Sequence, residues 1–137
     1  MQAGRMTDAE IIMASLEAVS ERCEDPAPLV YQRMFAKHPD MLPLFALDTD
    51  NAAREHMLHE TLMCVLDLCG EGAYAHNFIA NERQNHDQIG VPPEVFDTFY
   101  LTMAETFAEI LGNDWTPEFD TAWKRLIAKI TSLTLPA

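Results

Sequence analysis

The chain has 137 residues, of which 48% are hydrophobic and 23% are charged. This length suits a single domain over residues 1–137 that buries about two thirds of the surface its unfolded form exposes, and the composition argues against global disorder. Nine Lys and Arg side chains oppose 22 Asp and Glu side chains, which gives a formal net charge of −13. Such a field repels phosphate backbones and anionic membrane surfaces, so we expect neither nucleic acid nor a membrane as a partner.

The cysteines and the apolar segments bear on the cellular compartment. Cys23, Cys64 and Cys69 have spacings that match neither a disulfide framework nor a zinc site, and each is expected to be a small buried core residue. The N-terminus lacks a basic start followed by an apolar run, and no 18 uninterrupted apolar residues occur. We therefore expect a cytoplasmic protein that is neither exported nor membrane-spanning.

The first half of the chain predicts three helices and a corner marked by proline. A capping box from Thr7 to Glu10 begins the first helix, and a second helix is expected at about residues 28–37. Pro39 and Pro43 permit only a short helical turn that ends at Phe45. A long helix follows at about residues 51–69, and its expected buried face comprises Leu58, Leu62, Val65, Leu66 and Cys69.

Three further helices are expected in the second half. One covers about residues 73–87 and is closed at Gly90, and the next begins at Pro93 and ends before Gly112. The last begins near Thr116 and buries a side that includes Leu133. Since no run alternates with period two, the chain is predicted to be all-α, with about seven helices of unequal length rather than a symmetric four-helix bundle.

Several motifs along the chain occur together in one known family. The run from Tyr31 to Pro39, followed by Pro43-Leu44-Phe45, resembles the second and third helices of bacterial hemoglobins and of the globin domain of flavohemoglobins. The run from His86 to Val91 and the later motifs at residues 110–112, 116–118 and 122–123 are similar to the proximal half of the same family. This resemblance to a bacterial single-domain globin spans about residues 10–130. It implies a globin-like fold that encloses a pocket for heme b.

Within that resemblance, His86 is the candidate iron ligand, because a neutral imidazole coordinates iron well and a helix can fix its position. The alternative is a surface histidine near a helix C-terminus. The resemblance places Phe45 against the heme and Val91 and Phe96 on its proximal side. It also places Tyr31 where its hydroxyl can donate a hydrogen bond to the bound gas, with a core tyrosine that donates to a backbone carbonyl as the alternative.

The helix on the gas-binding side departs from the family pattern. Counting from Phe45 without a gap, the position that usually holds Gln or His falls near Glu55, beside His56 and one turn before His59. His56 or His59 could ligate the iron directly or share hydrogen bonds with Tyr31, and both could equally face solvent.

The proximal side is expected to polarise His86 only weakly. Phe96 replaces a tyrosine that some relatives carry, and the chain ends in residues 133–137 without a carboxylate at the matching position. A weak effect favours reversible binding or sensing over cleavage of an oxygen–oxygen bond.

Three functions follow as hypotheses. The first is a globin that reversibly binds oxygen or a related diatomic gas at a His-ligated heme iron. The second is a nitric oxide dioxygenase that takes electrons from a separate reductase. The third is a heme-free globin-like signalling module, in which side chains fill the slot. The sequence leaves the physiological gas and the oligomeric state open.

Overall fold

The structure is a computed structural model that describes residues 6–70 and 72–133. In these residues it contains six α-helices, two short 3-10 helices and no strand, so the predicted all-α class is confirmed. The elements are α1 (Asp8–Arg22), α2 (Ala27–Lys37), η1 (Pro39–Phe45), α3 (Ala52–Cys69), α4 (Ala73–Gln88), α5 (Pro93–Leu111), η2 (Gly112–Asp114) and α6 (Pro117–Ser132).

Local signals set several of the helix boundaries. The Thr7 hydroxyl accepts the Glu10 amide at 3.1 Å, and the Glu10 carboxylate accepts the Thr7 amide at 3.0 Å, which confirms the predicted capping box. The Thr116 hydroxyl accepts the Phe119 amide at 3.1 Å at the start of α6. Each cap satisfies an amide that has no partner within its helix, so these starts are fixed by the residues next to them.

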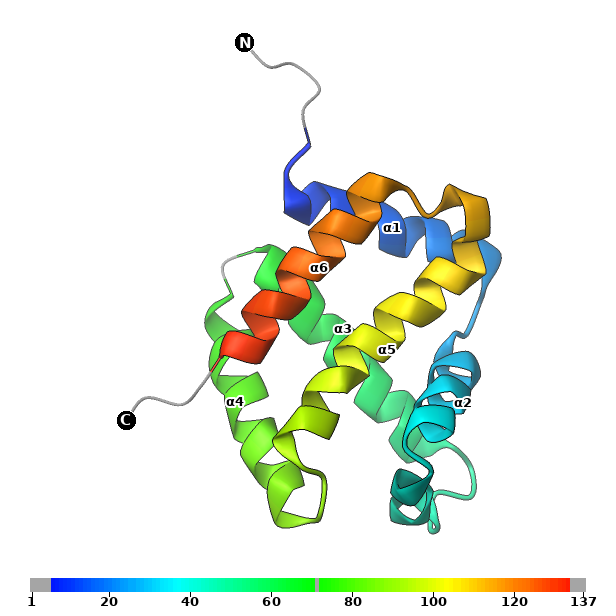
Figure 1. The fold of residues 1–137 in the computed structure, drawn as a ribbon, viewed down its shortest axis with the longest axis vertical. Helices are drawn as coiled ribbons and strands as arrows, with labels where there is room; N and C mark the ends of the chain where they lie inside the picture. The colour runs from blue at the N-terminus through cyan, green and yellow to red at the C-terminus, as the bar shows by residue number, and fades with distance from the viewer. Residues whose placement is uncertain (1–5, 71, 134–137) are drawn as a thin grey trace.

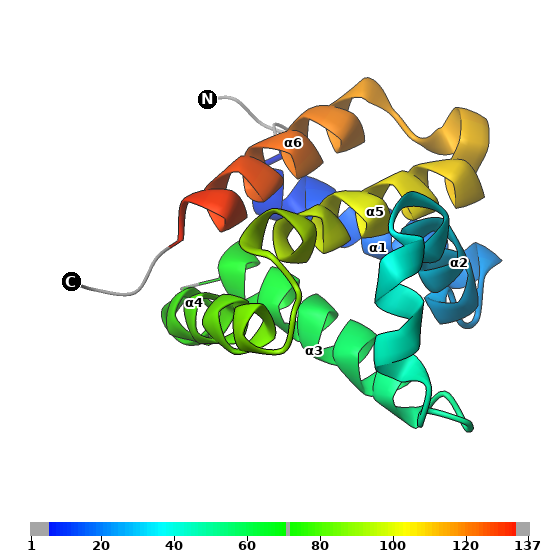
Figure 2. The ribbon, with the colours of Figure 1, turned by 60° about the horizontal axis from the view of Figure 1, so that its bottom comes forward.

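The central element is α5, which contacts α1, α2, α4 and α6. Figure 2 shows α3 and α4 on one side of α5 and α6 on the other. In Figure 1 α5 crosses in front of α3, and α4 descends at the left from near the upper-left end of α3. The helix α4 contacts both α3 and α5, and residues of all three helices line a cavity. None of the described helices is long and apolar enough to cross a bilayer.

The buried face of α3 is rotated from the predicted one. Leu58 and Val65 are buried as predicted, but Leu62 is only half-buried and Leu66 is 37% exposed. The buried positions of α3 are Leu58, Thr61, Cys64, Val65 and Leu68. The difference arises because α3 contacts α1, α2 and α4, so its buried surface is wider than one stripe and includes a threonine. Leu62 and Leu66 instead line a surface groove beside α1.

The predicted burial of the cysteines is confirmed for one of the three. Cys64 is buried, and burial raises the pKa of its thiol to about 12. Cys23 and Cys69 are half-buried and line the groove between α1 and α3. All three are free thiols, so no disulfide constrains the described residues.

Candidate functional site

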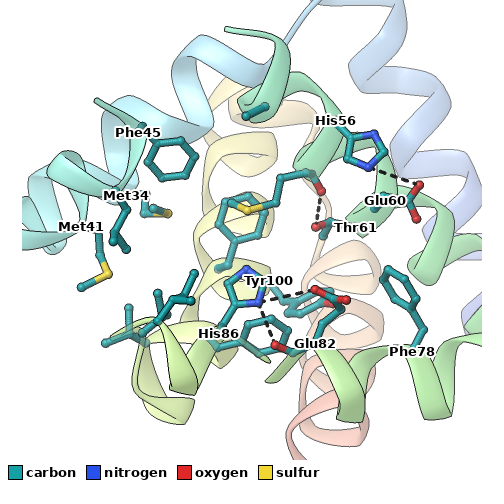
Figure 3. A pocket seen from close by; sticks show the side chains of 18 of the residues that line it. Met34, Met41, Phe45, His56, Glu60, Thr61, Phe78, Glu82, His86 and Tyr100 are labelled. Atoms are coloured by element: carbon teal, nitrogen blue, oxygen red, sulfur yellow. Dashed lines mark hydrogen bonds and ion pairs between the residues drawn. The ribbon is translucent and has the colours of Figure 1, made fainter. Parts of the chain in front are cut away.

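A cavity of about 600 Å³ lies between α3 and α4 and reaches η1 and the first turns of α5. Its volume falls in the range of small-molecule and cofactor sites, which are mostly apolar with a few placed polar groups. His86 from α4 and Thr61 from α3 reach it from opposite sides (Figure 3). Most of its lining is apolar, including Met34, Met41, Phe45, Met57, Phe78, Val91, Phe96 and Phe99.

The last turn of α4 places His86 on the cavity wall. Its Nδ1 lies 2.7 Å from the main-chain oxygen of Glu82, and its side chain is 24% exposed. A carbonyl oxygen can only accept, so Nδ1 carries the proton and Nε2 of the neutral ring keeps its lone pair. The ring centroid lies 5.0 Å from that of Phe96. This partly buried, oriented imidazole differs from the freely solvated surface histidine that the sequence left as the alternative.

A carboxylate also lies beside His86. Oε2 of Glu82 is 3.6 Å from Nδ1, and Glu82 lines the same cavity. The expectation of a weakly polarised His86 rested on Phe96 and on the end of the chain, and it did not include this carboxylate. Residues 134–137 lie outside the described residues, whereas Glu82 belongs to α4 itself. The i, i+4 spacing of Glu82 and His86 was the signal that could have revealed it.

Three other residues assigned from the resemblance line the cavity together with His86. Phe45 at the end of η1 packs edge-on against Tyr31, with ring centroids 5.6 Å apart. Val91 is 8% exposed, and its amide donates to the His86 carbonyl at 2.9 Å. Phe96 in the first turn of α5 packs at a tilt against the His86 ring, with an angle of 56° between the ring planes. Together with His86 they line an apolar part of the cavity.

Tyr31 does not line the cavity. Its hydroxyl donates to the main-chain oxygen of Arg54 at 2.9 Å, and the residue is 3% exposed. Burial raises the pKa of its phenol far above the usual range, so the hydroxyl keeps its proton. The structure therefore has the core tyrosine that the sequence left as an alternative to a gas-facing one.

The two histidines of α3 have the exposed positions that the sequence left as one of the alternatives. His56 lies at the rim of the cavity, where its side chain is 75% exposed and Nε2 is 4.0 Å from a Glu60 carboxylate oxygen (Figure 3). His59 is exposed and is not part of the lining. Since each residue of a helix turns by about 100°, a residue two positions after Met57 points to a different side from Met57 and Thr61. Neither histidine faces His86, and Glu55 is exposed as well.

The residues of α3 that do face the cavity were missed in the sequence. Besides His56 and Glu60, they are Ala53, Met57 and Thr61, which follow one another at steps of four along one side of the helix. The Thr61 hydroxyl donates to the Met57 carbonyl at 2.8 Å, so its proton is held by the helix. Tyr100 of α5 was missed too, although it lies one turn after Phe96 and is buried.

The corner before α3 fixes the position of that helix. Asp48 accepts the amides of Ala53 at 2.9 Å and Arg54 at 3.0 Å, which caps α3. The Arg54 guanidinium donates to the Asp48 carbonyl at 2.9 Å and lies 5.2 Å from the centre of the Phe45 ring. A cation over an aromatic face is attractive, so Arg54 holds Phe45 against the cavity.

A family model described as Globin matches residues 29–133. The matched residues make up more than half of the chain and include η1, α3, α4 and α5, which form the cavity. His86 and every other residue described above as lining the cavity lie inside the match.

Proposed function

The chain belongs to the globin family, and on that premise we propose that it binds heme b in the cavity between α3 and α4, with His86 as the axial ligand. We further propose that it reversibly binds oxygen or a related diatomic gas there. One observation carries this proposal. Nδ1 of His86 is tied to the Glu82 carbonyl at 2.7 Å, which leaves Nε2 as a lone-pair donor on the wall of an apolar cavity of about 600 Å³.

The residues present fit a heme. An apolar slot excludes water, and an imidazole on one wall supplies the nitrogen that heme iron takes as an axial ligand. Phe45, Val91 and Phe96 provide the apolar contacts around it. Bound there, the heme supplies an iron that takes up a diatomic gas, and the protein supplies the axial nitrogen and the dry surroundings.

The residues of α3 that line the cavity determine which hydrogen-bond donors are available to a bound gas. Met57 and Ala53 are apolar, and the Thr61 hydroxyl already donates to a main-chain carbonyl. The Tyr31 hydroxyl is engaged with Arg54 outside the cavity. A gas on this side meets few hydrogen-bond donors, and a polarised ligand gains least from such surroundings. This chemistry supports reversible binding or sensing of a diatomic gas.

The open cavity counts against the heme-free signalling module, because that hypothesis requires side chains to fill the slot. A nitric oxide dioxygenase needs the same heme and a separate reductase as electron source. Its test is catalytic formation of nitrate when the oxygenated protein is mixed with nitric oxide and a reductase.

Heme reconstitution tests the proposal directly. The purified protein is titrated with hemin and its absorption spectrum is recorded in the ferric state, after reduction, and with carbon monoxide. We expect stoichiometric uptake, a strong Soret band and a shift with carbon monoxide. His86→Ala should abolish the spectrum of the histidine-ligated heme, whereas His59→Ala, at an exposed position on α3, should preserve it. No stoichiometric uptake, or an unchanged spectrum for His86→Ala, would contradict the proposal.

His56 provides a further check on the coordination of the iron. Because its side chain is 75% exposed and lies near Glu60, we expect His56→Ala to leave the reduced spectrum unchanged. A six-coordinate reduced spectrum that His56→Ala converts to a five-coordinate one would show that His56 moves inward when heme binds.

A further inference from the structure

Glu82 presents two acceptors to one proton of His86. Its main-chain oxygen lies 2.7 Å from Nδ1, and its carboxylate Oε2 lies 3.6 Å from the same atom. The contact with the main-chain oxygen is a hydrogen bond. The contact with the carboxylate is within ion-pair distance but just too long for a hydrogen bond. A shift of about 0.5 Å would bring the carboxylate into hydrogen-bond range of Nδ1.

We propose that the Glu82 carboxylate is a positioning residue that strengthens the electron donation of His86 to the heme iron. The inference rests on the proposed function, because it concerns the ligand that function assigns. The proton stays on Nδ1 throughout, and no group is transferred. The negative charge beside the N–H draws that proton outward and leaves the ring with more anionic character at Nε2.

The charge of Glu82 is not neutralised by the cation next to it in sequence. The Arg83 guanidinium donates to Asp97 at 2.9 Å and to the Ile130 carbonyl at 2.9 Å, and it lies 5.8 Å from the centre of the Phe96 ring. It also donates to the carbonyl of Leu133. Arg83 is therefore engaged with α5 and the end of α6, and Glu82 remains the charged partner of His86 on the cavity side.

A stronger nitrogen donor shifts the ferric/ferrous equilibrium of the iron in a known direction. Outer groups that accept from a ligating histidine raise its basicity, and a more basic ligand favours the ferric over the ferrous state. The Glu82 side chain is 35% exposed, so solvent screens part of its charge. We therefore expect the charge of Glu82 to have a moderate effect on the reduction potential and a measurable effect on the strength of the bond between iron and His86.

The chain offers a matched control in Glu60. This second carboxylate lines the same cavity from α3, but its contacts are with His56 at 4.0 Å and with the Tyr74 hydroxyl at 3.5 Å. Glu82→Gln and Glu60→Gln remove the same charge from the same cavity. They differ in whether the lost carboxylate lies beside His86.

The experiment uses the heme-loaded protein and its two variants. We measure the ferric/ferrous midpoint potential by spectroelectrochemistry and the iron–histidine stretching frequency of the ferrous form by resonance Raman spectroscopy. For Glu82→Gln we expect a lower stretching frequency and a higher potential, which corresponds to a fall of roughly threefold or more in the ferric-to-ferrous ratio at a fixed potential. Glu82→Asp, which keeps the charge, should recover part of both changes. Glu60→Gln should leave the stretching frequency at the unmodified value.

Two results would overturn the inference. Equal stretching frequencies in the unmodified protein and in Glu82→Gln would show that the carboxylate does not act through His86. An equal fall in Glu60→Gln would show that only the charge of the cavity matters. Both outcomes leave heme binding intact, whereas the lack of a Soret band in the unmodified protein would overturn the proposed function together with the inference.

Discussion

The Tyr31 hydroxyl donates a hydrogen bond to the main-chain oxygen of Arg54 across 2.9 Å. This bond joins α2 to the first turn of α3, at the residue whose guanidinium covers Phe45 and binds Asp48. The tyrosine therefore belongs to the framework that positions the α3 wall of the cavity rather than to the wall itself. Its hydroxyl would have to leave Arg54 before it could reach a ligand in the cavity.

Tyr31→Phe tests that assignment. Loss of a partly buried neutral hydrogen bond should lower the free energy of unfolding by about 1 kcal/mol. The dissociation rate of oxygen from the heme-loaded protein should change by less than about twofold, because the hydroxyl makes no contact in the cavity. Urea denaturation and stopped-flow kinetics measure the two effects, and Tyr74→Phe, at a residue that is 51% exposed, is the control for the denaturation measurement. A tenfold faster release of oxygen would show that the hydroxyl turns inward when heme binds.

The course of the helices could be predicted because its signals are local. A capping box at Thr7, prolines at 39, 93 and 117, and glycines at 70, 90 and 112 mark boundaries that the structure reproduces closely. Gly90 and Gly112 have φ values of 96° and 55°, a region that favours glycine, so each residue is suited to its place after a helix. Such signals act over a few residues and do not depend on the rest of the fold.

The rotation of α3 could not be predicted in the same way. Counting from Phe45 without a gap leads to Glu55, but the structure turns Met57 toward the cavity. The two-residue difference depends on the corner at residues 46–51, where Asp48 caps α3 through tertiary geometry. A loop of this length has no periodic pattern that would fix the phase of the next helix. The positions of His56 and His59 were uncertain for this reason.

The capped corner gives a pH-dependent prediction. Burial alone raises the pKa of Asp48, but hydrogen bonds from the amides of Ala53 and Arg54 and the Arg54 guanidinium outweigh it and leave that pKa below its usual value of 3.8. A carboxyl with a lowered pKa in the folded state contributes stability above its unfolded pKa, and this contribution is lost as the pH falls through the folded value. Asp48→Asn should thus destabilise the protein clearly at pH 6 and progressively less below about pH 4.

Thermal unfolding of both proteins from pH 6 to pH 3 measures this difference. Asp40→Asn, at an exposed position in η1, serves as the control and should show a small difference throughout. A gap between Asp48→Asn and the unmodified protein that stays constant over the whole range would show that the charge of Asp48 does not stabilise the corner.

Arg83 connects α4 to α5 and to the end of α6. Its guanidinium joins α4 to Asp97 of α5 and to two carbonyls at the end of α6, and its side chain is 13% exposed. Arg83→Ala leaves these acceptors without their donor, so the free energy of unfolding should fall by about 2 kcal/mol. Arg125→Ala is the control, because the Arg125 pair with Asp8 is exposed and should contribute less than about 0.5 kcal/mol.

Amide hydrogen exchange locates the effect of Arg83→Ala. The end of α6 should exchange faster in this variant, because its carbonyls lose the contact that holds the last turn against α4. Equal exchange at α6 in Arg83→Ala and Arg125→Ala would contradict the proposed connection.

Trp123 and Ser15 form a buried hydrogen-bonded pair outside the cavity. The indole Nε1 of Trp123 donates to the Ser15 hydroxyl at 2.8 Å, and that hydroxyl donates to the Ile12 carbonyl at 2.6 Å. Ser15 is 0% exposed, so Ser15→Ala would leave a buried N–H without an acceptor and should cost about 1–3 kcal/mol of unfolding free energy. Ser20→Ala, in the same helix at an exposed position, should stay within about 0.5 kcal/mol of the unmodified protein.

A double-mutant cycle distinguishes the unpaired indole from a simple loss of packing. In a Trp123→Phe background the indole N–H is absent, so Ser15→Ala should cost less there than in the unmodified protein. Urea denaturation of the four proteins measures the coupling. Equal costs in both backgrounds would mean that the hydrogen bond between α1 and α6 contributes nothing to stability. Heme uptake should be unchanged in all four proteins, because neither residue lines the cavity.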